Sequence, residues 1–130
     1  MKRILIVEDN ENNMYLISFI LKKKGFAILQ ARSGEEGIEL ANREKPDMIV
    51  MDIQLPGIDG LDATTRIRES GASGNVPIIA LTSYAMTGDR EKAIAAGCTG
   101  YIEKPINPDT FTEELGKYLN QGNEDENSDC

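Results

Sequence analysis

The sequence of 130 residues contains no histidine, and this absence excludes several kinds of active site. Ser-His-Asp and Cys-His catalysis, zinc binding through histidine and phosphorylation on histidine all need the imidazole ring. Carboxylates, hydroxyls and lysines remain as the chemically active groups. Any chemistry of this chain is therefore expected to use acids, hydroxyls and ammonium groups.

Cysteine is scarce as well, with Cys98 and Cys130 as the two examples. Cys130 ends a polar segment, which argues against a disulfide framework, and Cys98 is expected to be a small buried residue. No apolar run approaches the ~18 residues that a membrane-spanning helix needs. The beginning MKRILIVED lacks a signal-peptide pattern. We therefore expect a cytoplasmic protein without membrane insertion.

Basic residues are too few to balance the acids, and the formal net charge is -8 at pH 7. This charge repels a phosphate backbone, so direct binding to nucleic acid is not expected. Half of the excess lies in residues 120–130, which contain four acids and no base. We predict a folded domain over residues 1–119 and an acidic disordered tail over residues 120–130.

Short apolar runs alternate with longer segments of helical period, which indicates βαβ units. The expected strands are residues 4–7, 26–31, 48–51, 76–81 and 101–102, of which 26–31 has the weakest pattern. Continuous apolar runs are typical of strands buried on both faces of a parallel sheet. Right-handed crossovers place helices on both sides of such a sheet. The predicted fold class is therefore α/β, a doubly wound five-stranded sheet with five helices.

Capping residues mark the helices between these strands. Ser33-Gly34-Glu35-Glu36 is a capping-box pattern before the second helix, and Asn107-Pro108 supplies an N-cap and a first-turn proline before the fifth. Gly25 can take the left-handed conformation that ends the first helix. The third helix is expected to start near Asp59 and the fourth to cover about residues 87–96. The apolar face of the first helix contains Met14, Ile17, Ile20 and Leu21.

Polar side chains follow four of the expected strands at their C-terminal ends. They are Glu8 and Asp9, Asp52, Thr82, and Lys104. Ligands bind at this edge of open parallel sheets, so we expect these side chains to meet there. A carboxylate after a strand often only caps the next helix, but no helix is expected to start at Asp52.

Three carboxylates in one pocket need a cation to offset their repulsion. Two carboxylates about 4 Å apart repel by roughly 4 kcal/mol at an effective dielectric of about 20. An all-oxygen site suits Mg²⁺, which keeps several waters and commonly bridges to phosphoryl groups. An aspartate can act as the nucleophile toward a phosphoryl group whose charge is neutralised. We assign Asp52 as the nucleophile, Asp9 and Glu8 as metal-binding acids, Lys104 as the phosphoryl counter-charge and Thr82 as a hydrogen-bond donor.

Four segments resemble the receiver domains of two-component response regulators. They are Val7-Glu8-Asp9-Asn10, Asp52 with Pro56 and Gly60, Leu81-Thr82-Ser83, and Gly100-Tyr101-Ile102-Glu103-Lys104-Pro105-Ile106. The resemblance covers about residues 2–119. Residues 82–89 are most similar to stand-alone receivers of the DivK type and to receivers of hybrid histidine kinases. The resemblance implies a flavodoxin-like fold with sheet order 2-1-3-4-5.

The same resemblance implies roles for individual residues. The implied Mg²⁺ ligands are Asp9, Asp52 and the backbone carbonyl of Gln54, with Glu8 acting mostly through water. The Gln54 side chain would affect dephosphorylation. Tyr101 would turn inward when the Thr82 hydroxyl is drawn to a phosphoryl group on Asp52.

The implied function is a phosphorylation switch that changes protein binding and turns over no separate substrate. A histidine kinase or histidine phosphotransfer protein would phosphorylate Asp52. A downstream protein would then bind the surface formed by the fourth helix, fifth strand and fifth helix, since no output domain is expected in this chain. Two alternatives stay open, a phosphorylation-independent interaction module and an aspartate-nucleophile phosphatase. Such phosphatases usually have a second aspartate two residues after the nucleophile, where this chain has Gln54.

Overall fold

The computed structural model describes residues 2–70, 75–82 and 88–127, with side chains up to Tyr118. Within these residues one parallel sheet has the order β2-β1-β3-β4-β5, formed by β1 (Arg3–Val7), β2 (Ala27–Ala31), β3 (Met48–Asp52), β4 (Ile78–Thr82) and β5 (Gly100–Glu103). The helices are α1 (Glu11–Lys23), α2 (Gly34–Glu44), α3 (Gly60–Ser70), α4 (Asp89–Ala96) and α5 (Pro108–Asn127). The predicted fold and strand order are therefore confirmed.

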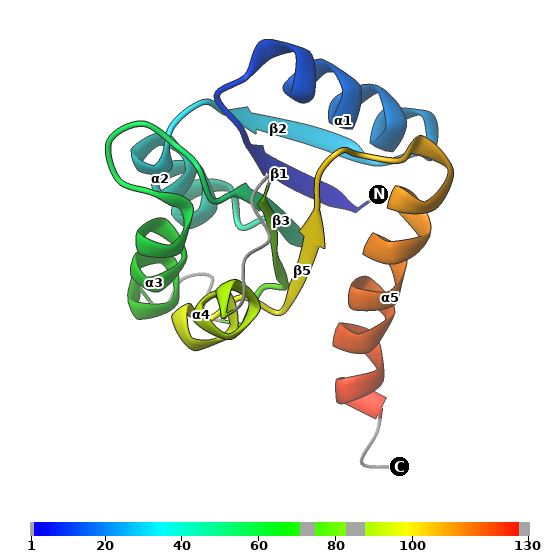
Figure 1. Ribbon diagram of the computed structural model, residues 1–130. Helices are drawn as coiled ribbons and strands as arrows, with labels where there is room; N and C mark the ends of the chain where they lie inside the picture. The colour runs from blue at the N-terminus through cyan, green and yellow to red at the C-terminus, as the bar shows by residue number, and fades with distance from the viewer. Residues whose placement is uncertain (1, 71–74, 83–87, 128–130) are drawn as a thin grey trace.

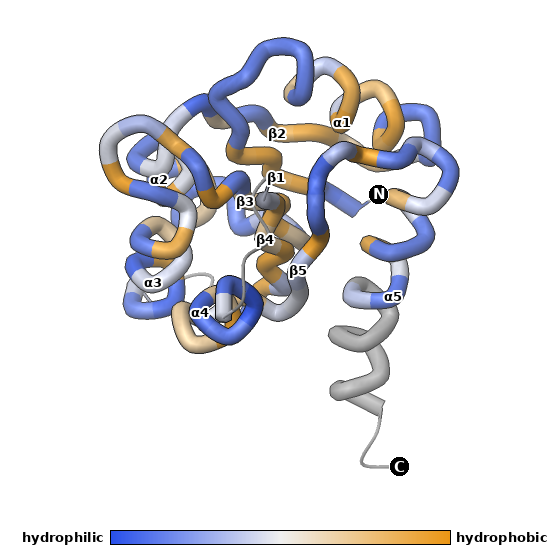
Figure 2. The backbone as a smooth tube through the Cα atoms, in the orientation of Figure 1, coloured by the Kyte–Doolittle hydropathy of each residue, from blue (hydrophilic) through white to orange (hydrophobic). Residues whose placement is uncertain are grey.

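The sheet is covered on both faces, with α1 and α5 on one side and α2, α3 and α4 on the other (Figure 1). Successive side chains of a strand point to opposite faces. Ile4 and Ile6 of β1 accordingly belong to one buried cluster, which includes Met14 of α1 and Phe111 of α5. Leu5 belongs to the other cluster, on the side of α2, α3 and α4. Figure 2 shows the hydrophobic residues concentrated along the strands.

The predicted capping residues lie at the helix ends, with Ser33 and Asn107 at the starts of α2 and α5 and Gly25 after the end of α1. The Ser33 hydroxyl accepts a hydrogen bond from the Glu36 backbone N–H at 3.1 Å. The Glu36 carboxylate accepts from the N–H of Arg32 rather than from that of Ser33, so the second half of the capping box is shifted by one residue. Gly25 follows α1 with φ at +96°, and the Asn107 side chain accepts from the Asp109 N–H at the start of α5.

Several element boundaries differ from the prediction by one or two residues. β4 begins at Ile78 rather than at residue 76, because Pro77 has no N–H to donate to the sheet. α3 begins at Gly60, and Asp59 caps it by accepting a hydrogen bond from the Asp62 N–H at 2.8 Å. The predicted start of the fourth helix at residue 87 lies outside the described residues, and α4 is described from Asp89.

α5 continues to Asn127, past the point at which the predicted tail begins. Side chains after Tyr118 lie outside the described set, as does Cys130, so the disordered tail stays a prediction. Cys98 is buried, as expected from its residue type. Among the helices of the described residues, none is both long and apolar enough to cross a membrane.

Candidate functional site

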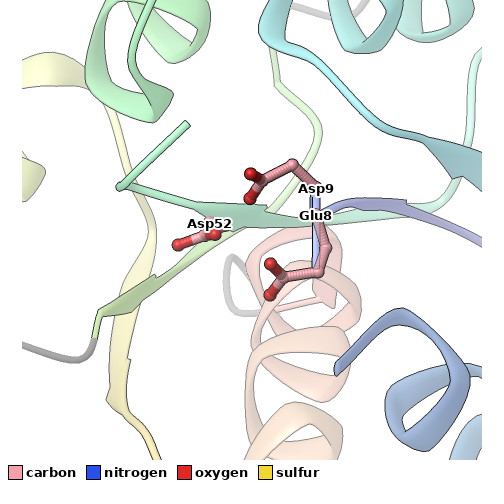
Figure 3. Close-up of side chains that lie close together, drawn as sticks. All are labelled: Glu8, Asp9 and Asp52. Carbon is pink, nitrogen blue, oxygen red and sulfur yellow. The ribbon is translucent and has the colours of Figure 1, made fainter. Parts of the chain in front are cut away.

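The order of the strands brings Glu8, Asp9 and Asp52 into one cluster. β1 pairs with β3, and Val7 lies opposite Met51, so the residues after β1 stand beside the end of β3. One carboxylate oxygen of each acid lies within 4.8 Å of the others. Figure 3 shows these carboxylates gathered at the ends of the two strands. The three acids assigned from the sequence are therefore neighbours.

The cluster borders a hollow of about 470 Å³ that is open to solvent. Glu8 and Asp52 are buried, with 1% and 2% of their surface exposed, whereas Asp9 is exposed. The lining residues are Glu8, Asp9, Asn10, Glu11, Asn13, Asp52, Gln54 and Lys104. Apart from Lys104, these side chains offer oxygen atoms as metal ligands, with no thiolate or imidazole group among them, and this set of ligands fits Mg²⁺.

Lys104 supplies a positive charge to the two buried acids. Its Nζ lies 2.9 Å from Glu8 Oε1 and 3.4 Å from Asp52 Oδ1. The Lys104 backbone N–H donates to the Thr82 carbonyl at 2.7 Å, which ties the residues after β5 to the end of β4. Because the Lys104 side chain is only 11% exposed, solvent screens its charge weakly.

Asp52 is difficult to ionise in this environment. Burial raises the pKa of Asp52 to about 7, and a hydrogen bond with Glu8 and the negative charge of Glu8 add to the increase. The Lys104 ammonium and the Gln54 backbone N–H, 3.1 Å from Asp52 Oδ1, act in the opposite direction. A bound cation would favour the ionised carboxylate in place of the proton.

Thr82 lies at the end of β4 with 1% of its surface exposed. Gln54, which is exposed and lines the hollow, donates a hydrogen bond from Nε2 to Thr82 Oγ1 at 3.0 Å. The sequence pattern does not indicate this bond, because the two residues are 28 positions apart and belong to different strand ends.

Tyr101 of β5 is half-buried. Its side chain packs against the buried cluster on the side of α2, α3 and α4. The hydroxyl oxygen is buried, and among the described residues it has no hydrogen-bond partner.

Three residues from the start of α1 also line the hollow, and the strand-end pattern does not include them. They are Asn10, Glu11 and Asn13. Asn10 is the N-cap of α1, and its Oδ1 accepts a hydrogen bond from the Asn13 N–H at 2.9 Å. An asparagine directly before a helical apolar pattern is a typical N-cap, and this pattern in the sequence indicates that Asn10 starts the helix beside the site. The positive end of the α1 dipole favours an anion at this position.

Comparisons with known proteins agree with this geometry. The sequence profile of the response regulator receiver domain matches residues 4–116. The polar-differentiation response regulator DivK of Brucella anthropi is 41% identical over 118 residues, covering 91% of this chain and 96% of the relative. DivK of Brucella ovis is 42% identical with the same coverage.

Solved structures of receiver domains have the same fold. The receiver domain of the sensor histidine kinase PA1611 from Pseudomonas aeruginosa, with a magnesium ion coordinated in its active site cleft, is 36% identical, with a TM-score of 0.85. That match covers 92% of this chain and 98% of the other. A CheY-like receiver domain from Methanospirillum hungatei is 26% identical, with a TM-score of 0.89 over 96% of this chain and 98% of the other. The chain therefore belongs to the receiver domain family of two-component response regulators.

Proposed function

We propose that this chain is a phosphorylation switch in which Asp52 accepts a phosphoryl group in a Mg²⁺-dependent reaction. The observation that carries the proposal is the position of the Asp52 carboxylate, which borders an open acidic hollow and lies 3.4 Å from the Lys104 ammonium. A nucleophile, a counter-charge and a cation site are thus adjacent. Asp9, Asp52 and the Gln54 carbonyl would hold the Mg²⁺ ion, with Glu8 acting mostly through water.

In the transfer step, an oxygen of Asp52 attacks the phosphorus atom of a donor phosphohistidine. A phosphorus–oxygen bond forms as the phosphorus–nitrogen bond of the donor breaks, and the electron pair of that bond returns to the imidazole. Lys104 stabilises the negative charge of the phosphoryl oxygens, and the N-terminus of α1 adds its dipole. Bound Mg²⁺ supplies further charge neutralisation.

The readout begins at Thr82, whose hydroxyl would donate a hydrogen bond to the phosphoryl group. Phosphorylation then acts as a ligand that shifts the protein between two conformations. The surface of α4, β5 and α5 would change with this shift and bind a different partner. A hollow of about 320 Å³ on this surface is lined by Tyr101 and Glu103 of β5 and by Phe111 of α5.

The proposed partners are a histidine kinase or histidine phosphotransfer protein as donor, and a downstream protein that distinguishes the two conformations. The chain would promote only its own phosphorylation and dephosphorylation, and so would not act as an enzyme on other substrates. As part of the same proposal the switch operates in the cytoplasm, where ATP-dependent kinases and Mg²⁺ are available.

The test is phosphorylation by acetyl phosphate, followed by intact-mass spectrometry. The wild-type chain should gain one phosphoryl group with Mg²⁺ present and none after chelation with EDTA. Asp52→Asn should gain none under either condition. Asp62→Asn is the matched control, because Asp62 is an exposed aspartate of α3 outside the hollow, and it should be phosphorylated like the wild type. An undiminished adduct in Asp52→Asn would show that another residue is the acceptor.

A further inference from the structure

The edge strand β2 also ends in a charged side chain beside the site. Arg32 directly follows β2 in the chain. β2 pairs with β1, and the Glu8 backbone N–H donates to the Ala31 carbonyl at 3.0 Å. The residue after β2 therefore lies next to the residues that follow β1. The polar strand ends recognised in the sequence do not include Arg32.

Arg32 forms an ion pair with Glu11 at the rim of the acidic hollow. Its Nε lies 2.5 Å from Glu11 Oε1, and its Nη2 lies 3.3 Å from Glu11 Oε2. The side chains of Arg32 and Glu11 are 45% and 72% exposed, so the pair adds little to the stability of the fold. Glu11 lines the hollow, however, and the pair places a positive charge beside it.

The backbone that carries Arg32 is held on both sides. The Arg32 N–H donates to the Glu36 carboxylate at 2.6 Å, and the Ser33 hydroxyl accepts from the Glu36 N–H at 3.1 Å. These bonds attach the turn after β2 to the start of α2, while the Ala31 carbonyl attaches it to the end of β1. The guanidinium group therefore reaches Glu11 from a fixed position.

The charges around the hollow act in opposite directions on its two proposed ligands. Among the described residues that line the hollow, four are acids and one, Lys104, is a base, which leaves a formal excess of three negative charges. A cleft of one sign attracts counter-ions and repels ions of its own sign. The excess therefore favours Mg²⁺ and disfavours an anionic phosphoryl donor. Arg32 reduces this excess by one charge through its contact with Glu11.

We propose that Arg32, paired with Glu11, sets the balance in this hollow between binding of Mg²⁺ and approach of an anionic phosphoryl donor. Without the guanidinium group, the charge of Glu11 is unpaired. The hollow then attracts Mg²⁺ more strongly and repels the donor more strongly. This inference rests on the proposed function, and it adds a residue that neither holds the metal nor touches the phosphoryl group.

The experiment compares Arg32→Gln with the wild type at fixed pH. Amide NMR titration gives the Mg²⁺ affinity, and intact-mass spectrometry gives the rate of phosphorylation by acetyl phosphate at saturating Mg²⁺. At about 0.01 M salt, Arg32→Gln should bind Mg²⁺ about two- to fivefold more tightly and be phosphorylated about two- to fivefold more slowly. Its affinity for beryllofluoride, an anionic mimic of the phosphoryl group, should fall by a similar factor. Both differences should vanish at about 1 M salt, where charges are screened within about 3 Å.

Three further variants separate this electrostatic role from a merely structural one. Glu11→Gln removes the opposite charge, so it should bind Mg²⁺ more weakly and be phosphorylated faster than the wild type. The double variant of Arg32→Gln and Glu11→Gln keeps the net charge and should return both quantities to about the wild-type values. Arg43→Gln is the matched control, because Arg43 pairs with Glu39 and Glu44 on α2 and does not line the hollow. It should behave like the wild type.

The outcomes distinguish this inference from the function on which it rests. A wild-type Mg²⁺ affinity and phosphorylation rate in Arg32→Gln at low salt would overturn the role of Arg32. Weaker Mg²⁺ binding and slower phosphorylation in both single variants would also overturn it, because the ion pair would then only hold the start of α1 in place. Asp52 would remain the acceptor in both cases. Failure of the wild type to bind Mg²⁺ or to gain a phosphoryl group would overturn the proposed function, and the inference with it.

Discussion

At the scale of single residues, the buried Asp52 connects the chemistry of the site to the stability of the fold. Its pKa is about 7 in the folded protein, against an ordinary value of 3.8, chiefly because burial disfavours the charged form. The folded protein therefore binds the Asp52 proton more tightly than the unfolded chain does. This contribution to stability is fully present below pH 3.8 and is lost as the pH rises to about 7.

We therefore predict that Asp52→Asn is more stable than the wild type at pH 8 in the absence of divalent cations. The expected gain in the free energy of unfolding is about 1–2 kcal/mol, since solvent in the hollow reduces the roughly 1.4 kcal/mol that each pKa unit represents. The gain should disappear near pH 4, where Asp52 is largely protonated. Urea denaturation from pH 4 to pH 8 measures it. Equal unfolding midpoints at pH 8 would contradict the raised pKa.

We predict that Thr82 is needed for the conformational change that follows phosphorylation, but not for acceptance of the phosphoryl group. Thr82→Ala should still bind beryllofluoride with Mg²⁺, because the cations stabilise the added charge of about -1.5 to -2. A neutral hydrogen bond contributes only about 0.5–1.5 kcal/mol, which is nevertheless a large part of the few kcal/mol separating two conformations. The amide shifts of α4, β5 and α5 should therefore be incomplete, whereas Thr82→Ser should restore them. Equal shifts in Thr82→Ala and the wild type would exclude the coupling role.

At the scale of elements, α1 presents an exposed stripe that begins at the acidic hollow. The stripe consists of Glu11, Tyr15, Phe19 and Lys23, which recur every four residues and so lie on one face of the helix. Tyr15 and Phe19 are 71% and 53% exposed, their ring centroids are 6.2 Å apart, and Lys23 Nζ lies 6.0 Å from the Phe19 centroid. Glu11 lines the acidic hollow. A donor protein that reaches Asp52 would therefore also cover this stripe.

We predict that Phe19→Ala slows phosphotransfer from a histidine-phosphorylated protein donor by about tenfold or more, because aromatic residues dominate many protein interfaces. Phosphorylation by acetyl phosphate should not change, since this small donor does not cover α1. The control is Ile94→Ala, which removes an exposed apolar side chain of α4 that is 47% exposed. The measurement is the transfer rate from a donor identified by screening kinases and phosphotransfer proteins. Equal slowing with acetyl phosphate would place the effect in the site itself.

At the scale of the whole molecule, the negative charge is unevenly distributed along the chain. Residues 120–130 carry half of the net charge of -8 and no basic residue. Such a polar segment of like charges cannot bury enough apolar surface to offset the entropy of ordering its side chains. The described end of α5 extends into this segment as far as Asn127, but helical backbone alone adds little to stability without packing.

Truncation after Asn120 is accordingly predicted to change the thermal unfolding midpoint by less than about 3 °C, which for a domain of this size is under roughly 1 kcal/mol. Circular dichroism melting of the full and truncated chains measures the change. Phosphorylation by acetyl phosphate serves as the control for an intact site. A decrease of many degrees would mean that the tail packs on the domain, and loss of a bound partner would give the tail a function.

Much of the fold follows from local patterns in the chain. Continuous apolar runs predict β1, β3 and β4, because a strand buried on both faces needs continuous apolar side chains. The edge strands β2 and β5 are less buried, and their patterns are correspondingly weaker. Capping residues such as Ser33 and Asn107 predict helix starts, because unpaired N–H groups need acceptors. Apolar patterns do not specify which strands pair, so only the resemblance to receiver domains predicts the strand order.

The site residues can be predicted from the sequence around each of them, whereas the contacts between them depend on the folded sheet. Asp52 can be assigned from the sequence because it directly follows the apolar run 48–51, and Lys104 because it lies two residues after the short run 101–102. Lys104 contacts Glu8 across 96 positions, and this contact exists only because the parallel sheet aligns the strand ends. The bond from Gln54 to Thr82 likewise depends on how β3 and β4 are paired. Side-chain contacts of this kind require the packed sheet, because local propensity sets the backbone of each element but not its distance from the others.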